Sequence, residues 1–349
     1  MRALLVDAAR ARPEVREVAD PSCPADGVVV RVGATGLCRS DWHAWAGHDD
    51  GVAFPHVPGH ELAGEVVETG PDIVRWRVGQ RVTVPFVCGC GRCAWCRAGE
   101  AQVCPDQQQP GFTHWGSFAE LVALHAADAN LVALPDGVDL PTAAGLGCRF
   151  ATAYRALVAR ARLDAGEWVT VIGAGGVGLS AVMIAHALGA RVVAVDRNPD
   201  ALAVATDLGA EQVLVADATT DVPAAVADLT GGGSHVAVDA VGSEQTSADA
   251  VRSLRRRGRL AQVGLLPPVD GHPRVPMDRV IAWELDLLGS HGMAAADYPE
   301  LLRLVEAGTL QPQRLVERTV TLEDAAALLP VFDRTPVAGM TIIEPQRVP

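Results

Sequence analysis

The chain has 349 residues, of which 49% are hydrophobic and 20% are charged, and its formal net charge is -13. These proportions are typical of a globular protein of about two domains and exclude an intrinsically disordered chain. The acidic excess makes nucleic acid and anionic membrane surfaces poor partners, because both repel negative charge.

Charged residues interrupt the apolar start of the chain at Asp7, Arg10 and Arg12, before it reaches the length of a signal-peptide core. No later apolar run reaches the roughly 18 to 20 residues that a membrane span requires. We therefore expect a cytoplasmic protein with no membrane partner. In a reducing compartment, its eight cysteines should be metal ligands or buried thiols rather than disulfides.

Up to about residue 149, short apolar runs are broken by Gly and Pro, which predicts a mostly β domain with long functional loops. Its predicted strands are 28–32, 62–67 and 81–87. From about residue 150, strands alternate with helices, as in a parallel sheet covered by helices. The predicted strands there are 168–172, 191–195, 212–215, 236–241, 260–265 and 285–288, and the predicted helices are 179–188 and 200–208. About six such strands make a doubly wound dinucleotide fold.

The last sixty or so residues hold one predicted helix near 299–307 and a terminal strand near 340–343, and we expect them to return to the first domain. Three consecutive arginines, Arg255, Arg256 and Arg257, precede Gly258. We interpret them as a helix C-terminus whose positive charge complements the helix dipole. The overall acidity argues against a nucleic-acid role for them.

Four cysteines fall within one short segment, at Cys90, Cys93, Cys96 and Cys104. Glycines in and beside this segment allow the tight turns needed to bring four thiols to one ion, so the spacing predicts a closed tetrahedral zinc site. Buried thiols without a metal are the alternative, but free cysteines have no reason to cluster at such intervals. A redox or DNA-binding zinc ribbon is disfavoured because no basic surface surrounds the segment.

Three other metal-ligand candidates are separated in sequence, at Cys38, His60 and Cys148. Taken alone, each is more simply explained as a packed core residue. If they converge, two thiolates and a neutral imidazole would cancel the charge of the ion and leave a fourth position for water or substrate, which is a catalytic arrangement. His60 and Glu61 do not form a metalloprotease signature, because Gly64 stands four residues after His60.

Residues 173–178 read Gly-Ala-Gly-Gly-Val-Gly, between an apolar strand and an apolar helix, which is the context of a dinucleotide site. Gly173 allows the turn, Gly175 lets the backbone approach a diphosphate, and Gly178 permits close contact of helix and strand. The next strand ends at Asp196, whose carboxylate would accept ribose hydroxyls and repel a 2′-phosphate. This favours NAD, although the neighbouring Arg197 leaves NADP open. A strand-turn-helix without ligand is the alternative.

Together these residues resemble the zinc-dependent alcohol dehydrogenases of the medium-chain dehydrogenase/reductase superfamily. The resemblance covers essentially the whole chain. Its elements, in the order and approximate spacing of the family, are Cys38-x-Ser40-Asp41-x-His43, Gly59-His60-Glu61, the four-cysteine segment, Gly147-Cys148 with Thr152-Ala153-Tyr154, and the turn at 173–178. It implies an α/β protein with a GroES-like catalytic domain over 1–149, a Rossmann NAD-binding domain over 150–287, and a C-terminal return over 288–349.

The resemblance also implies a catalytic zinc at Cys38, His60 and Cys148, a structural zinc at the four-cysteine segment, NAD as cofactor, and a homodimer or homotetramer. By the same resemblance, Ser40 takes the alcohol proton and His43 passes it to solvent through the nicotinamide ribose. Asp41 would orient His60, and Glu61 would lie close behind the metal as an occasional alternative ligand. The implied cofactor contacts are Arg39, Thr152, Gly173, Gly175, Gly176, Val177, Gly178, Asp196, Arg197, Val241, Val263, Gly264 and Leu265.

Two positions depart from the family pattern. Many members carry a Gly-Arg pair that binds the pyrophosphate near the C-terminus, where this chain has Gly339 and Met340. The loop His48-Asp49-Asp50 lies where relatives often carry apolar or aromatic pocket residues. Candidates for the substrate pocket wall, with ordinary core packing as the equal alternative, are Trp45, Phe86 and Trp115.

The expected reaction is reversible hydride transfer between NAD and an alcohol/aldehyde or ketone pair, with zinc as a Lewis acid. A polyol or amino-alcohol dehydrogenase is the alternative enzyme, which the acidic pair Asp49-Asp50 slightly favours. A zinc-stabilised protein that only senses NAD is the alternative outside enzymes. Ser40 and His43 argue against the sensor, because it needs no proton path. Cys23 and Cys88 have no predicted role.

Overall fold

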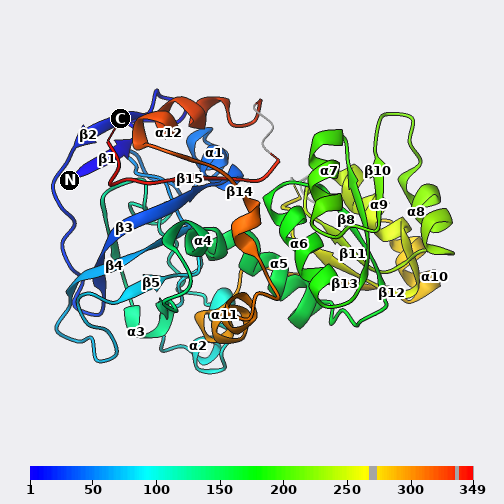
Figure 1. Ribbon diagram of the computed structural model, residues 1–349, viewed down its shortest axis with the longest axis horizontal. Helices are drawn as coiled ribbons and strands as arrows, with labels where there is room; N and C mark the ends of the chain where they lie inside the picture. Colours follow the sequence, from blue (N-terminus) through cyan, green and yellow to red (C-terminus); the bar gives the residue numbers. More distant parts are fainter. Residues whose placement is uncertain (267–272, 335–337, 349) are drawn as a thin grey trace. The chain divides into compact units, whose positions relative to one another are not determined.

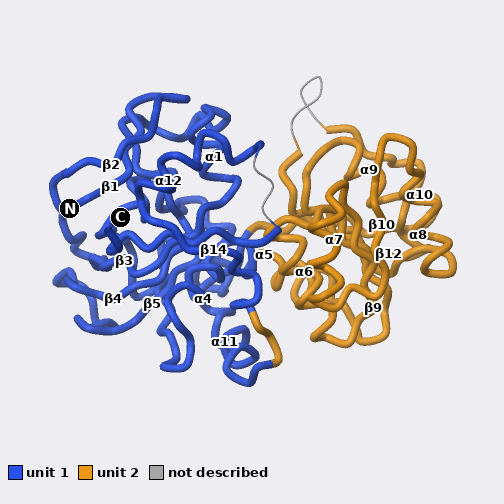
Figure 2. Tube along the Cα trace, turned by 45° about the horizontal axis from the view of Figure 1, so that its top comes forward, with its two compact units in different colours: residues 1–151, 292–308, 312–349 blue, residues 152–291, 309–311 orange. Residues whose placement is uncertain are grey.

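The computed structural model describes residues 1–266, 273–334 and 338–348. The chain divides into two compact units, coloured separately in Figure 2. Unit 1 comprises Met1–Ala151, Gly292–Gly308 and Pro312–Pro349, and unit 2 comprises Thr152–His291 and Thr309–Gln311. The polypeptide therefore completes most of unit 1, forms unit 2, and then returns to unit 1.

Unit 1 contains a mainly antiparallel sheet with the strand order β14-β15-β3-β4-β5-β7 (Figure 1), and β6 also pairs with β3. Among the described strands of this sheet, only β14 and β15 pair in parallel. Two further strands, β1 and β2, form an antiparallel pair. The strands of unit 1 are β1 Arg2–Leu5, β2 Glu14–Glu17, β3 Val28–Leu37, β4 Leu62–Thr69, β5 Arg81–Thr83, β6 Leu121–Leu124, β7 Val132–Ala133, β14 Val316–Val320 and β15 Met340–Ile343. This β-rich unit confirms the fold class expected for the first domain.

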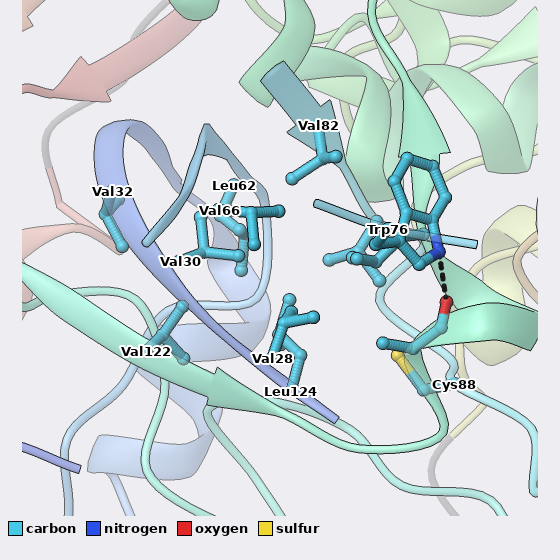
Figure 3. Packing of buried hydrophobic residues seen from close by; sticks show 13 residues of the cluster. Val28, Val30, Val32, Leu62, Val66, Trp76, Val82, Cys88, Val122 and Leu124 are labelled. Atoms are coloured by element: carbon cyan, nitrogen blue, oxygen red, sulfur yellow. Dashed lines mark hydrogen bonds between the residues drawn. The ribbon is translucent and has the colours of Figure 1, made fainter. Parts of the chain in front are cut away.

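The core of this sheet follows from the alternation of side chains along each strand. Figure 3 shows apolar residues of β3, β4, β5 and β6 packed in one cluster, with Trp76 at one side of it. The indole Nε1 of Trp76 donates a hydrogen bond of 3.1 Å to the carbonyl of Ala127. The fully buried members include Val28, Val30, Val32, Leu62, Val66 and Val82. Because β3 and β4 are fixed by this burial, the loops at their ends start from defined positions.

Short helices and turns connect the strands of unit 1. They are α1 Arg39–Trp45, α2 Ala94–Arg97, η1 Ala101–Val103, α3 Ala127–Asn130, α4 Leu140–Gly145, η2 Leu146–Phe150, η4 Ala295–Asp297, α11 Tyr298–Glu306, η5 Pro312–Leu315, α12 Leu322–Leu328 and η6 Leu329–Val331. The wide turn η2 is a π-helix, an element that occurs often at functional sites. Within the described ranges, no helix combines the length and apolarity needed to cross a membrane.

Unit 2 holds a parallel sheet whose six described strands have the order β10-β9-β8-β11-β12-β13. Its strands are β8 Trp168–Ile172, β9 Arg191–Asp196, β10 Gln212–Val215, β11 Ser234–Asp239, β12 Leu254–Gln262 and β13 Asp286–Gly289. Its helices are α5 Ala151–Arg155, η3 Ala156–Arg160, α6 Gly176–Ala187, α7 Pro199–Asp207, α8 Val222–Thr230, α9 Glu244–Arg252 and α10 Met277–Trp283. The predicted doubly wound sheet is confirmed, and its strand order reverses between β8 and β11, where such folds bind ligands.

The interpretation of the arginine triplet is wrong. Helix α9 ends at Arg252, and Arg255 to Arg257 lie within β12. The buried Leu254 begins the strand by pairing with Ser234, so the arginines extend along the strand with exposed side chains. Two of these guanidinium groups interact with nearby side chains and not with a helix terminus. Arg255 lies 2.7 Å from the Nε2 of His235, and Arg257 forms an ion pair of 3.1 Å with Glu284. Because Leu254 is buried in the core of unit 2, the segment that follows it forms a strand, although its run of arginines is typical of a helix C-terminus.

Candidate active site

Antiparallel pairing of β3 with β4 brings together residues that are far apart in sequence. Thr35 near the end of β3 pairs with Leu62 at the start of β4, so Cys38 lies beside His60 and Glu61. Cys148 comes from the π-turn η2, whose carbonyl at Gly147 accepts a hydrogen bond of 2.9 Å from the backbone of Phe86. One ligand atom from each of four residues lies within 4.8 Å of the others: Cys38, His60, Glu61 and Cys148.

His60 has the environment of a metal ligand. Its side chain is fully buried, and its Nδ1 lies 3.0 Å from a carboxylate oxygen of Asp41. The other ring nitrogen, Nε2, is buried and has no hydrogen-bond partner among the described residues. A buried polar atom without a partner is unfavourable unless an ion or water binds it. The pair of thiols and this lone nitrogen therefore fit a zinc ion, for which carboxylate–histidine pairs are the usual outer support.

The charges around this site favour a bound cation. Burial opposes protonation of His60, but Asp41 facing it outweighs burial and raises the pKa of His60 well above its ordinary value. The thiol of Cys148 donates a hydrogen bond toward Cys38, which lowers the pKa of Cys38 well below that of a free thiol. The same hydrogen bond, together with burial, raises the pKa of Cys148. A divalent cation would replace the shared proton and stabilise both thiolates.

The four-cysteine segment forms a second cluster. The Sγ atom of Cys93 lies 3.5 Å from that of Cys96 and 3.7 Å from that of Cys104. Sulfur atoms at the corners of a tetrahedral zinc site would be about 3.8 Å apart, given Zn–S bonds of about 2.3 Å. The Sγ atoms of all four cysteines lie within 4.8 Å of one another. Backbone hydrogen bonds, first from Arg92, lower the pKa of Cys90 to about 6, which favours the thiolate form that binds zinc.

Helix α1 carries the predicted proton path. Its second residue, Ser40, is half-buried, and its Oγ lies 3.9 Å from the Sγ of Cys38. His43 follows three residues later, and residues at this spacing share one face of a helix. The Nδ1 of His43 lies 3.0 Å from the Nδ1 of His48, the residue that precedes the acidic pair Asp49-Asp50. Partial burial, and then the nearby His48 and Arg39, lower the pKa of His43.

The glycine turn of unit 2 lies between β8 and α6. A Cβ atom on Gly178 would stand 1.7 Å from the carbonyl oxygen of Gly173, so this close approach requires glycine. A Cβ atom on Gly175 would meet nothing within 4 Å, and no side chain caps the helix that begins at Gly176. The turn therefore offers free space at a helix N-terminus, which suits a diphosphate. Val177 follows in the first turn of α6 and is half-buried.

Asp196, at the end of β9, is tied to this turn. Its carboxylate accepts hydrogen bonds from the backbone nitrogens of Ala174, at 2.6 Å, and Asn198, at 2.8 Å. Each carboxylate oxygen has a second acceptor site, so the group retains capacity for ribose hydroxyls. Arg197 beside it is exposed.

The ends of β11 and β12 complete the same edge of the sheet. Asp239, which the sequence did not single out, is fully buried, and its carboxylate accepts hydrogen bonds from the backbone of Val241 and Gly242. Val241 and Leu265 are 52% and 83% exposed, so two apolar side chains stand in solvent at the switch point of the sheet. Val263 and Gly264, both half-buried, precede Leu265. An uncovered apolar edge of this kind fits the flat rings of a dinucleotide.

Known proteins share both units. A family model for an alcohol dehydrogenase GroES-like domain matches residues 24–136, and one for a zinc-binding dehydrogenase matches residues 176–307. An alcohol dehydrogenase of Geobacillus stearothermophilus is 33% identical over 338 residues, covering 96% of each chain. The chain belongs to the zinc-dependent alcohol dehydrogenases. This confirms the predicted class and favours an enzyme over a sensor.

Solved structures show the same fold along the whole chain of this dehydrogenase. The alcohol dehydrogenase TADH from Thermus sp. ATN1 has a TM-score of 0.90 and 31% identity, covering 99% of each chain. A structure described as an NAD-dependent alcohol dehydrogenase has a TM-score of 0.88 and 30% identity, covering 99% of this chain and 100% of that one.

The three predicted pocket-wall residues of the dehydrogenase differ in their surroundings. Trp45 packs against the core beside β1, and its indole donates to the carbonyl of Ala11 at 2.7 Å, so core packing explains it. Trp115 is 39% exposed. Phe86 lies near His60, with ring centroids 6.0 Å apart. Phe112, which the sequence did not single out, is closer to His60 than Phe86 is: the centroid of its ring lies 5.1 Å from the centroid of the imidazole.

The remaining predicted residues have simple placements. Arg39 is the exposed first residue of α1, and Thr152 is buried in α5, so their contacts with a cofactor stay predictions. Met340 is 1% exposed at the start of β15, so it fills a core position and offers no charge to a phosphate. Cys88 is buried in the core of unit 1, where burial raises its pKa to about 12, and it is a packed thiol.

Proposed function

We propose that this alcohol dehydrogenase binds two zinc ions per chain and uses NAD to interconvert an alcohol and its aldehyde or ketone. The catalytic ion would be held by Cys38, His60 and Cys148, and the structural ion by the four-cysteine segment. The unpartnered Nε2 of the buried His60, next to two thiols, is the observation that carries the proposal. We also propose three functional segments in the chain: a catalytic domain over 1–149, a cofactor domain over 150–287 and a return segment over 288–349.

When bound, the zinc ion would supply Lewis acidity toward the substrate oxygen, and NAD would supply the hydride acceptor. The residues of the chain handle the proton. We assign to Ser40 the role of accepting this proton at Oγ while it releases its own hydroxyl proton, because Oγ lies beside the ligand Cys38. His43, on the same helix face, would accept the proton that Ser40 releases, and its lowered pKa favours the neutral imidazole that can do so.

NAD is supported by Asp196 and by the relative described as NAD-dependent. We expect Asp196→Ser to relax the preference for NAD over NADP, because it removes an acceptor for the ribose and the repulsion of a 2′-phosphate. The change should appear mainly in the KM of the cofactor, measured by steady-state kinetics with both cofactors. Asp200→Ser, an exposed change on α7, is the matched control. Equal kcat/KM of the native protein for NAD and NADP would contradict the assignment to Asp196.

His43→Gln tests the outer end of the proton path. We expect a modest loss of alcohol oxidation at neutral pH, because water or buffer replaces an exposed base. The deficit should grow as pH falls, since the native imidazole, with its lowered pKa, stays neutral while hydroxide becomes scarce. Below the pKa of His43 the native enzyme loses its base as well, and the two profiles should converge. Parallel pH profiles of kcat for both proteins would contradict the role.

The substrate class is the remaining choice. The acidic pair Asp49-Asp50, which slightly favoured a polyol or amino alcohol, is exposed to solvent. Its exposure does not strengthen the choice of either substrate class. A screen of NADH formation across primary, secondary, aromatic, polyol and amino alcohols tests the proposed function, and absence of turnover with every class would overturn it. A homodimer or homotetramer is proposed as the assembly, to be measured by light scattering.

A further inference from the structure

The carboxylate of Glu61 is enclosed by one residue, Arg149. Its Oε1 accepts hydrogen bonds from the backbone nitrogen of Arg149, at 3.1 Å, and from Nε, at 2.9 Å. Its Oε2 accepts from Nε, at 3.1 Å, and from Nη2. Glu61 is 0% and Arg149 is 5% exposed. The two therefore form a buried, two-pronged ion pair, the strongest geometry that a guanidinium offers a carboxylate.

The surrounding backbone is shaped to hold this pair. A Cβ atom on Gly36 of β3 would stand 2.0 Å from Oε2 of Glu61 and 2.8 Å from Nη2 of Arg149. The backbone nitrogen of Gly36 donates to the carbonyl of Glu61 at 2.7 Å. Tyr298, fully buried, donates to the carbonyl of Leu146 in the turn that carries Arg149, at 3.1 Å. The position of the guanidinium is thus fixed from the strand and from the turn.

Glu61 lies close enough to the other three residues of the cluster to serve as a fourth metal ligand. One of its oxygens lies within 4.8 Å of the ligand atoms of Cys38, His60 and Cys148. Carboxylate oxygens bind zinc readily, and a site with four protein ligands is closed to substrate. In the structure both oxygens of Glu61 are occupied by Arg149. The ion pair is also electrically neutral, so it leaves the charge of the metal site unchanged.

We propose that Arg149 is a positioning residue that holds Glu61 off the catalytic metal and so keeps the fourth coordination position open to substrate. This rests on the zinc site proposed above. It also limits the role of Glu61 expected from the family resemblance, since Glu61 would reach the ion only after breaking its bonds to Arg149.

The test uses the full-length protein with Co²⁺ in place of zinc, whose visible spectrum changes when a ligand binds at an open position. Imidazole is the probe, because it is neutral and its affinity does not depend directly on the charge of Arg149. We expect Arg149→Leu to bind imidazole about 10- to 100-fold more weakly than the native protein, the range typical for loss of an outer partner of a metal site. The double variant Arg149→Leu/Glu61→Gln should regain near-native binding, because no carboxylate remains to close the site.

The outcomes separate the two proposals. A native cobalt protein whose spectrum does not respond to imidazole would overturn the open metal site, and this role with it. Unchanged imidazole affinity in Arg149→Leu, or equal weakening in the double variant, would overturn only the role of Arg149. If Arg149→Leu does not fold, Arg149→Lys replaces it: the ammonium keeps the charge but lacks the two-pronged geometry, and affinity should still fall. Native affinity in Arg149→Lys would then contradict the proposal.

Discussion

Dialysis against a chelator will abolish turnover before the fold melts. The expected catalytic site has three protein ligands, so a chelator can bind the ion at the fourth position and withdraw it. The four-cysteine site leaves no such position, and its ligands come from one short segment. Burial does not explain the difference, because Cys38 and His60 are buried whereas Cys90, Cys93 and Cys96 are half-buried.

The measurement combines elemental analysis, activity and circular dichroism along the dialysis. We expect two zinc ions per chain at the start, loss of one ion together with activity, and retention of helical signal. Added zinc should restore turnover, which excludes irreversible unfolding. Freshly purified protein with one zinc per chain or none, or activity that persists after the first ion has left, would contradict the two-site assignment.

Ser40→Ala should lower kcat by at least about 10²-fold, because general acid–base assistance is typically worth about 10² to 10⁴ in rate. The hydroxyl lies 3.9 Å from the Sγ of Cys38, so its loss removes the group of the proposed path that stands beside the metal cluster. Zinc content and NAD affinity should stay nearly unchanged, since Ser40 is not among the clustered ligands.

Single-turnover kinetics is the appropriate measurement for Ser40→Ala, because product release does not then limit the rate. Ser22→Ala, a change at an exposed serine, is the matched control and should leave kcat unaltered. Near-normal single-turnover rates in Ser40→Ala would remove Ser40 from the mechanism.

The predicted elements of unit 2 agree with the structure better than those of unit 1. The strand at 168–172 coincides with β8, because a buried parallel strand is a continuous apolar run that sequence alone reveals. The strand at 212–215 coincides with β10, an edge strand on which Val213 and Val215 are exposed. In unit 1, β3 continues five residues beyond its predicted end at residue 32, whereas β5 ends at Thr83 rather than at residue 87. Strand length there depends on which neighbour supplies hydrogen bonds, and that is a property of the sheet.

The sequence by itself determined the features whose parts are close together along the chain: the four thiols of the cysteine segment and the glycine turn with Asp196. Each is built by one or two consecutive elements, so spacing and residue type suffice. Only the tertiary structure decided which distant residues meet. Glu61 and Arg149 are joined by the register of β3 with β4 and by the turn η2. Such contacts depend on sheet register and close packing, which bring together residues whose separation in sequence carries no signal.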